Sequence, residues 1–364
     1  MRVLIIGGTG LISTAITRLL VARGDAVTVF NRGRSAFEGA ARVEGRSDFA
    51  GAEAVGGRSA SAGSDGVAQI VGDRTDLADF EAKVAAAGPF DCAIEMRCFT
   101  PAEAASAVRA FRGRARQVIF CSTVDVYQKP AARYPTTEEE PRREGPGVFT
   151  YAHDKAECER VLLAAATRGD FALTIVRPAH TYGEGGTVLH TFRGATTYLD
   201  RLRKGLPVIV HGDGTALWVS CHRDDVAPAF VAAAGDAATF GQAYQVTGEE
   251  WLTWNRYTEL VAEALGAPPP TIVHIPTDLL RAVAPERAFW CAENFAGNNI
   301  FDNARAHAEL GFRQTIPFLE GTRRTIAWLD AHNRIVDCGG DPFDDRLIEA
   351  WGRLGVGMVG EVGE

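Results

Sequence analysis

The sequence predicts an α/β fold: a doubly wound parallel β-sheet with helices on both faces, followed by a smaller C-terminal lobe. Short apolar segments alternate with amphipathic segments over roughly the first half of the chain, and a glycine-rich turn joins the first two. Beyond residue 180 the alternation becomes irregular. A chain of 364 residues is also long for one domain. We therefore expect residues 1–178 to form the first domain and 179–364 mainly the second, with about 217–248 returning to the first.

The N-terminal segment is typical of a strand–helix–strand unit. Residues 3–6 form an unbroken apolar run, as expected of a strand that is buried on both faces. Apolar residues then recur at helical spacing over 11–20, Gly24 stands where glycine often ends a helix, and residues 26–30 favour a strand. Because such crossovers are almost always right-handed, the two strands should be parallel neighbours.

Later segments extend this pattern. The expected strands are residues 68–71, 92–96, 118–122, 173–176 and 244–246, with helices at 101–111 and 154–166. Residues 51–66 contain five Gly and three Ser, which predicts a flexible excursion between two strands. Residues 134–147 are rich in Pro, Glu and Arg, and this loop is either a solvated connection or a lid over a bound molecule.

The composition excludes several classes of protein. Hydrophobic residues make up 46% and charged residues 23%, which is ordinary for a globular chain. The net charge of −8 disfavours nucleic acid as a partner. The longest apolar runs are too short for a membrane span or a secretory signal, so we expect a cytoplasmic protein without a membrane partner. Seven cysteines without C-x-x-C spacing predict neither a zinc site nor a disulfide framework, and we expect no metal.

Glycines mark the turn between the first strand and the first helix. The pattern Gly7-x-x-Gly10-x-x-Ser13 lets the backbone approach a pyrophosphate, and the helix N-terminus supplies free N–H groups. Ser13 stands where a third small residue is usual, and it should preserve the packing of helix on strand. The pattern predicts a Rossmann-type dinucleotide-binding domain with cofactor contacts from Gly7, Thr9, Gly10, Leu11 and Ile12.

The end of the second strand indicates which dinucleotide is bound. An NAD site usually has Asp or Glu there to bind the ribose 2′-hydroxyl. This chain has Asn31, Arg32 and Arg34 and no carboxylate. Guanidinium groups suit a 2′-phosphate, so we expect NADP(H) to be preferred, with NAD(H) as the alternative. Asp73, which follows the third strand, is either an acceptor for the adenine amino group or a simple turn residue.

Tyr151 and Lys155 are separated by one helical turn. This i, i+4 spacing places both side chains on one face of a helix. An ammonium group beside a phenol favours the phenolate and so lowers the phenol pKa. The chain has only four lysines, which makes a chance pairing rare. The pair predicts that Tyr151 is a general acid/base near neutral pH.

Hydroxyl residues follow the strand at 118–122. Ligands of open α/β sheets bind at the carboxyl ends of the strands. We therefore expect Thr123 to face a reacting carbonyl or alcohol and to share its proton with Tyr151. The alternative is a hydroxyl that only bonds backbone at the end of the strand.

Taken together, four motifs resemble those of an extended short-chain dehydrogenase/reductase of the NAD(P)-dependent epimerase/dehydratase type. They are Gly7-Gly8-Thr9-Gly10, Ser122-Thr123-x-x-Val126-Tyr127, Tyr151-x-x-x-Lys155 and Arg177-Pro178-x-x-x-Tyr182-Gly183, in that order. The resemblance extends to about residue 330, and residues 30–33 resemble a branch of nucleoside-diphosphate-sugar epimerases. It implies that Tyr151 is the base, that Lys155 holds the nicotinamide ribose and that Thr123 orients the substrate oxygen.

The resemblance implies further site residues and an assembly. Met96 and Pro178 would line the cofactor, and Ser122, Thr123, His180 and Tyr182 would contact the substrate. His180 is otherwise a packed core histidine. The resemblance also implies a homodimer in which the helices at 101–111 and 154–166 of two copies form a four-helix bundle.

The chain departs from the family pattern at two turns. Val124-Asp125 replaces the Asp-Glu pair of sugar dehydratases, so elimination of water is not expected, although Asp125 is a candidate acid/base at a substrate carbon. Glu95-Met96-Arg97 replaces a turn of small residues, and Glu95 and Arg97 are candidates for an ion pair. His222 and Asp225 are expected to be structural, as part of a stretch that orders the second lobe.

These features favour an NAD(P)-dependent oxidoreductase or isomerase that transfers a hydride at a carbinol or keto carbon of a sugar or sugar nucleotide, as an epimerase does. The alternative within the same class is an NADPH-dependent carbonyl reductase acting on a substrate without a nucleotide. The alternative from another class is a non-catalytic protein that binds a dinucleotide or RNA.

Overall fold

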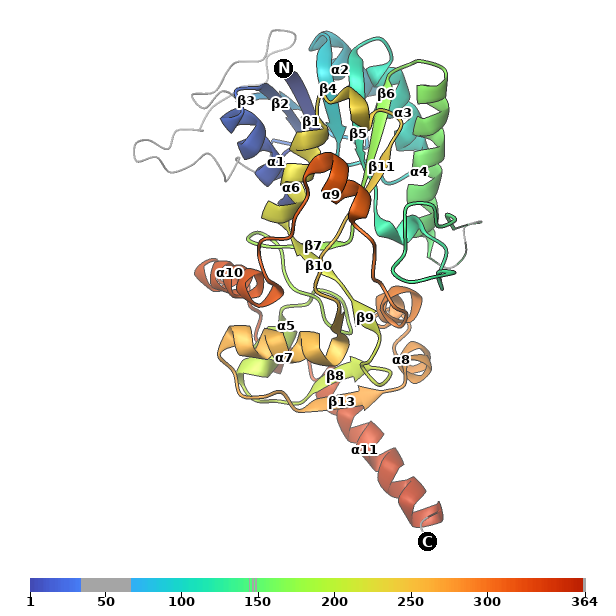
Figure 1. The fold of residues 1–364 in the computed structure, drawn as a ribbon. Coiled ribbons are helices and arrows are strands. Elements are labelled where there is room, and N and C mark those ends of the chain that lie inside the picture. The colour runs from blue at the N-terminus through green and yellow to red at the C-terminus, as the bar shows by residue number, and fades with distance from the viewer. Residues whose placement is uncertain (34–66, 144, 146, 148, 363–364) are drawn as a thin grey trace. The chain divides into compact units, whose positions relative to one another are not determined.

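The computed structural model describes residues 1–33, 67–143, 145, 147 and 149–362, with side chains as far as Leu354 (Figure 1). Arg34 and the segment 51–66 lie outside the described residues. The chain divides into two compact units. The first consists of Met1–Thr181, Arg223–Thr247 and Phe301–Thr315, and the second of Tyr182–His222, Gly248–Ile300 and Ile316–Glu364.

A parallel sheet of seven strands forms the centre of the first unit, in the order β11-β6-β5-β4-β1-β2-β3. The predicted α/β fold is thereby confirmed. The strands are β1 (Arg2–Ile6), β2 (Ala26–Asn31), β3 (Val67–Val71), β4 (Phe90–Glu95), β5 (Ala115–Cys121), β6 (Ala172–Pro178) and β11 (Ala243–Val246). Residues 3–6 are fully buried, which explains their unbroken apolar run.

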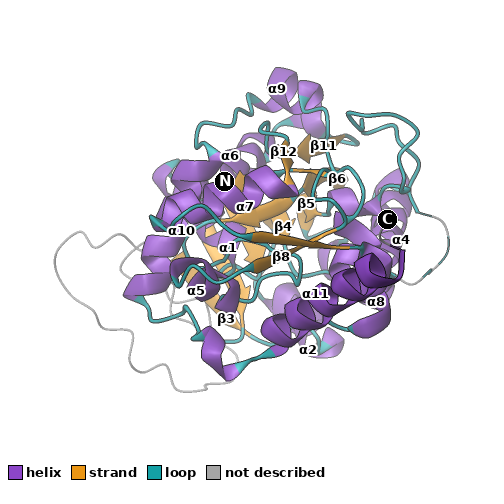
Figure 2. Cartoon of the chain, turned by 90° about the horizontal axis from the view of Figure 1, so that it is seen from below, coloured by secondary structure: helices purple, strands orange, loops and turns teal. Residues whose placement is uncertain are grey.

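Helices cover both faces of this sheet. Helices α1 and α6 pack together on one face, and α2, α3 and α4 pack in sequence on the other (Figure 1). Figure 2 shows α1 and α6 on one side of the strands and α4 on the other. The helices of this unit are α1 (Leu11–Ala22), α2 (Leu77–Ala86), α3 (Pro101–Phe111), α4 (Thr150–Thr167), α6 (Arg223–Ala233) and α9 (Ala304–Leu310). Because β1, β4 and β5 are parallel, their carboxyl ends lie at the same end of the sheet, and the glycine turn lies there too.

The loop between β5 and α4 is tied down over most of its described length. Arg142 pairs with Tyr127 as an isolated β-bridge. The carboxylate of Glu138 accepts a hydrogen bond from the backbone N–H of Gln245 at 2.9 Å, and Glu139 forms an ion pair with Arg305. These contacts anchor the described part of the loop to β11 and α9 of its own unit, so it is not a simple solvated connection.

The second unit is built around short strands and helices. Its elements are β8 (Val208–His211), β9 (Leu217–Trp218), β10 (Ser220–His222), β12 (Leu252–Thr253), β13 (Ile272–Ile275), α5 (Thr197–Arg203), α7 (Trp254–Leu265), α8 (Thr277–Val283), α10 (Phe318–Ala331) and α11 (Phe343–Val362), and β7 (His180–Tyr182) crosses the boundary between the units. Strands β8 and β13 are parallel. Trp254, Tyr257 and Phe318 are central to its buried core. None of the described helices is both long and apolar enough to cross a membrane.

Candidate active site

The turn after β1 is shaped by glycine and closed by Ser13. Gly7 has φ +83°, a conformation that favours glycine, and its N–H donates to the carbonyl of Phe30 at 2.8 Å. The Ser13 hydroxyl donates to the Gly7 carbonyl at 2.6 Å and accepts from the Gly10 N–H at 2.8 Å. Ser13 therefore holds the turn closed besides being small enough to pack. The turn leads directly into α1, so its backbone fits a bound pyrophosphate.

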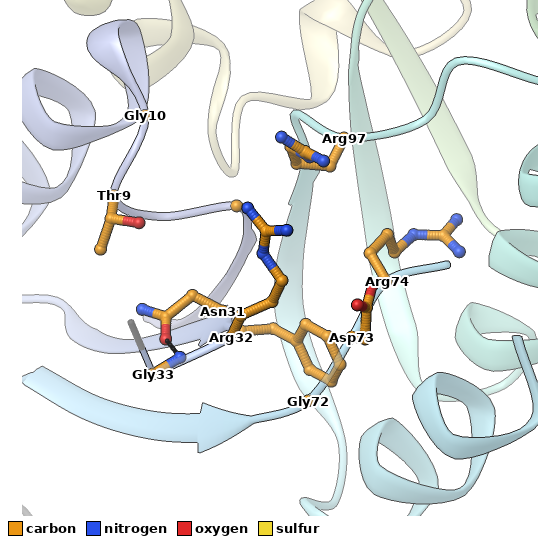
Figure 3. Close-up of a pocket in the computed structure, with 11 residues that line it drawn as sticks. Thr9, Gly10, Asn31, Arg32, Gly33, Gly72, Asp73, Arg74 and Arg97 are labelled. Atoms are coloured by element: carbon orange, nitrogen blue, oxygen red, sulfur yellow. Dashed lines mark hydrogen bonds between the residues drawn. The ribbon is translucent and has the colours of Figure 1, made fainter. Parts of the chain in front are cut away.

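A cavity of about 240 Å³ opens beside this turn, at the carboxyl ends of β1 to β3 (Figure 3). It is lined by Gly7, Thr9, Gly10, Phe30, Asn31, Arg32, Gly33, Gly72, Asp73, Arg74 and Arg97. The predicted cofactor residues Gly7, Thr9, Gly10, Asn31, Arg32 and Asp73 are all in this set. We call it the adenosine-side cavity, because the fold places the glycine turn and the end of β2 in its wall.

Arg32 is exposed at the end of β2 and has no ion pair or hydrogen bond with any described side chain. Its neighbour Asn31 uses its side-chain oxygen to accept from the N–H of Gly33 at 2.9 Å and from the Gln69 amide at 2.6 Å, and so shapes the turn. The carboxylate of Asp73 accepts from the backbone and hydroxyl of Thr75 at 2.9 and 2.7 Å. Asp73 is thus a turn residue that also lines the cavity, so the structure is consistent with both of its predicted roles.

A second cavity of about 280 Å³ lies at the ends of β4, β5 and β6. It brings together Thr123, Tyr151 and Lys155, three of the four residues predicted to be catalytic, while the fourth, Asp125, is not in its lining. It is also lined by Gly7, Gly10, Leu11, Ile12, Ser13, Met96, Arg97, Phe99, Cys121, Ser122, Pro178, Ala179 and Thr181. We call it the Tyr151 cavity. This lining includes Leu11, Ile12, Met96 and Pro178, whose contact with a cofactor stays a prediction.

Lys155 is fixed between two strand ends. Its side chain is 2% exposed, and its ammonium donates to the carbonyls of Cys121 at 2.6 Å and Cys98 at 3.0 Å. It also lies 4.3 Å from the centre of the Phe120 ring. These contacts place a positive charge in the wall of the Tyr151 cavity, one helical turn from Tyr151 on α4.

Helix α4 contributes a third residue that the sequence analysis did not single out. Glu159 follows Lys155 by four positions and is fully buried. The guanidinium of Arg177 donates to both of its carboxylate oxygens, at 2.8 and 2.7 Å, and the Ser122 hydroxyl donates to it at 2.6 Å. The i, i+4, i+8 series of Tyr151, Lys155 and Glu159 was the available signal. Ser122, which was predicted to contact substrate, thus donates its hydroxyl hydrogen to Glu159.

Burial alone would raise the pKa of the Glu159 carboxyl, but the charges and hydrogen bonds of Arg177 and Arg142 hold that pKa below its ordinary value. Because the pKa is lowered in the folded state, the ion pair stabilises the fold fully above the ordinary glutamate pKa of about 4.3. This contribution is lost as the pH falls through the lowered value.

We expect Glu159→Gln to lower the free energy of unfolding by about 3–5 kcal/mol, because it leaves Arg177 buried with an incomplete partner. Urea unfolding at pH 7 measures this loss. Glu157→Gln on the same helix is the matched control, since Glu157 pairs with the exposed Arg160 and its replacement should cost little. Equal losses in the two variants would contradict the assigned role of the buried pair.

Thr123 lines the Tyr151 cavity, whereas Asp125, His180 and Tyr182 are not among its lining residues. Thr123 is in its wall and accepts from the N–H of Asp125 at 3.2 Å, so its proton is not used in that bond. The carboxylate of Asp125 instead contacts the ammonium of Lys129 at 3.3 Å. His180 is half-buried at the start of β7. Tyr182 is fully buried in the second unit, and its hydroxyl donates to the carbonyl of Phe318 at 3.3 Å.

Glu95 does not form the suggested ion pair with Arg97. Its buried carboxylate pairs with Arg74 at 3.2 Å, while its other oxygen accepts the backbone N–H of Arg97 at 2.9 Å. Two further contacts hold Arg74 in place for this ion pair. Its guanidinium donates to the carbonyl of Glu103 at 2.8 Å and lies over the Phe80 ring. Burial raises the pKa of Glu95, which Arg74 opposes. The side chain of Arg97 is left to project over the glycine turn.

The parallel sheet, the glycine turn and the Tyr151–Lys155 pair define a Rossmann-type dinucleotide-dependent enzyme of the extended short-chain dehydrogenase/reductase class. Residues 3–247 match the NAD dependent epimerase/dehydratase family, and the chain belongs to that family.

Two curated relatives are similar in sequence. The chain is 27% identical over 277 residues to a chloroplast stem-loop binding protein of 41 kDa from Arabidopsis thaliana, covering 75% of this chain and 65% of the relative. It is 26% identical over 302 residues to a 2′-dehydrokanamycin reductase from Streptomyces kanamyceticus, covering 83% of this chain and 77% of the relative. The chain therefore spans less than two thirds of the chloroplast protein's length.

The fold also matches solved structures. A UDP-glucose 4-epimerase from Thermus thermophilus, solved in complex with NAD, superposes with a TM-score of 0.65 at 21% identity, and the match covers 91% of this chain and 99% of the epimerase. At this level of identity the likeness supports the fold alone.

Proposed function

We propose that this protein transfers a hydride at a carbinol or keto carbon of a sugar or sugar nucleotide, with NADP(H) as the preferred dinucleotide. As in an epimerase, the hydride would return from the dinucleotide to the same substrate. One observation carries this proposal. Thr123, Tyr151 and Lys155 line one cavity, which shares Gly7 and Gly10 with the adenosine-side cavity. A dinucleotide has two nucleosides joined by a pyrophosphate, and the two cavities meet at the turn suited to that pyrophosphate.

Each residue has a defined part in the chemistry. Tyr151 takes the proton from the substrate hydroxyl, or returns it to the carbonyl oxygen. The ammonium of Lys155 stabilises the phenolate, and the Thr123 hydroxyl holds the substrate oxygen in position. When bound, the nicotinamide ring supplies or accepts the hydride. Gly7, Gly10, Met96 and Pro178 would hold that half of the dinucleotide against the cavity.

Consumption of the dinucleotide tests how it is used. An epimerase returns the hydride to its substrate, so product should form with no net absorbance change at ~340 nm and with the dinucleotide in catalytic amounts. The measurement combines absorbance with product analysis for a panel of sugar nucleotides. Stoichiometric loss of NADPH would contradict an epimerase and support the second candidate.

That second candidate is an NADPH-dependent carbonyl reductase. The end of β2, where Arg32 takes the place of a carboxylate, favours NADPH and hence reduction. The similarity to a 2′-dehydrokanamycin reductase also supports it. RNA binding is not proposed from the chloroplast relative, because the net charge of −8 disfavours contact with phosphate backbones.

The homodimer implied by the family resemblance stays a prediction, which sedimentation at micromolar concentration would test.

A further inference from the structure

Arg97 stands where the two cavities meet. Among the described residues, only Gly7, Gly10 and Arg97 line both of them. The two glycines belong to the turn that fits a pyrophosphate, so Arg97 faces the same place from the end of β4. A residue at this junction is positioned for the link between the two nucleosides rather than for either base.

The backbone of Arg97 is held firmly. Its N–H donates to the buried Glu95 carboxylate, which Arg74 anchors in turn. The side chain then extends over Gly7 so closely that a Cβ added to Gly7 would lie 2.2 Å from its Cγ. Figure 3 shows Arg97 and Arg32 directed into the adenosine-side cavity from opposite sides, while Arg74 points away from it.

The positive charge of Arg97 has no acidic partner within the described part of the chain. Its guanidinium has no carboxylate within ion-pair distance there, and it lies 5.4 Å from the centre of the Phe99 ring. Arg32, across the cavity, also lacks an acidic partner among these residues. Two guanidinium groups that face one cavity repel each other unless an anion lies between or beside them. Guanidinium groups bind phosphate oxygens by charge-assisted hydrogen bonds.

We propose that Arg97 binds the pyrophosphate of the dinucleotide from the side opposite the glycine turn. This inference rests on the proposed function in that the cavities hold a dinucleotide. It assigns the two arginines different phosphates: Arg97 binds the pyrophosphate that NAD and NADP share, and Arg32 binds the 2′-phosphate that only NADP carries. Arg97 is therefore a determinant of dinucleotide affinity, whereas Arg32 is a determinant of dinucleotide choice.

Calorimetry with four probes separates these assignments. For Arg97→Ala we expect NAD⁺, NADP⁺ and ADP-ribose each to bind roughly 10- to 100-fold more weakly, because each has the pyrophosphate. Adenosine 2′-monophosphate, which lacks it, should bind within about twofold of the wild-type affinity. Arg97→Lys should recover part of the loss, since it keeps the charge but not the fork of donors.

Arg116→Ala is the matched control, because Arg116 is an exposed arginine near the amino end of β5, away from the cavities. Circular dichroism and thermal unfolding check that each variant is folded. Two results would overturn the proposal: a loss confined to NADP⁺ and adenosine 2′-monophosphate, or no loss beyond that of Arg116→Ala.

The design distinguishes this inference from the proposed function. Equal wild-type affinity for NAD⁺ and NADP⁺ would contradict the proposed NADP(H) preference, yet the ADP-ribose result would still decide the role of Arg97. Absence of binding of every dinucleotide probe to the wild type would overturn both.

Discussion

Tyr151→Phe is expected to lower kcat by about 10²–10⁴-fold, because it removes a positioned acid/base while keeping the ring. Affinity for NADP(H) should hardly change, since the glycine turn and Lys155 remain. Steady-state rates on the converted substrate, together with calorimetry on the dinucleotide, make the comparison. The Phe variant would contradict the account if it kept more than about a tenth of the wild-type rate.

Lys155→Met is unsuitable as the control for that experiment. The ammonium of Lys155 joins the carbonyls of Cys98 and Cys121, so its removal would disturb the ends of β4 and β5 as well as the chemistry. Tyr134→Phe is a better control, because Tyr134 is an exposed tyrosine that lines neither cavity. It should leave the rate unchanged.

Arg32→Ala should weaken NADPH binding by about 10- to 150-fold and change NADH binding little. A charge-assisted hydrogen bond to the 2′-phosphate contributes roughly 1.5–3 kcal/mol, and about 1.4 kcal/mol corresponds to a tenfold change in affinity. Titration of both dinucleotides into wild type and variant measures the difference. Because Arg34 is a second candidate, the double variant should show the larger loss.

Equal losses for the two dinucleotides would give Arg32 a structural role. So would equal affinity of the wild type for both. The site would then be an NAD site that binds its ribose in some other way, because no carboxylate ends β2.

The residues that lie together in the Tyr151 cavity could be predicted because the topology fixes their location. In a parallel sheet the carboxyl ends of neighbouring strands share an edge, so Thr123 after β5 and the glycine turn after β1 had to lie on the same side. The spacing of Tyr151 and Lys155 placed both on one face of α4 in the same way. These relations depend on local pattern and strand order.

The ion pairs could not be predicted, because each depends on long-range packing. Sequence proximity suggested Arg97 as the partner of Glu95, yet its partner is Arg74, which α3 and the Phe80 ring orient. The helical spacing marks Glu159, but nothing local predicts its buried bond with Arg177 on β6. That bond, in turn, fixes Ser122. The start of α4 was expected at residue 154 rather than at Thr150, since Phe149 precedes the helix without a side-chain cap to mark it.

The chemistry proposed for the Tyr151 cavity is the transfer of a hydride, not of a proton, at the reacting carbon. An NMR product screen in heavy water tests it most directly, with NADP⁺ or NADPH bound and with uridine, guanosine and thymidine diphosphate sugars as candidate substrates. We predict that wild type converts at least one of them, that the reacting carbon carries no solvent deuterium, and that Tyr151→Phe does not convert it. If none of the sugars is converted by the dinucleotide-bound protein, the proposed substrate class is wrong. Solvent deuterium at the reacting carbon would show that a proton is abstracted there, and this result would contradict hydride transfer.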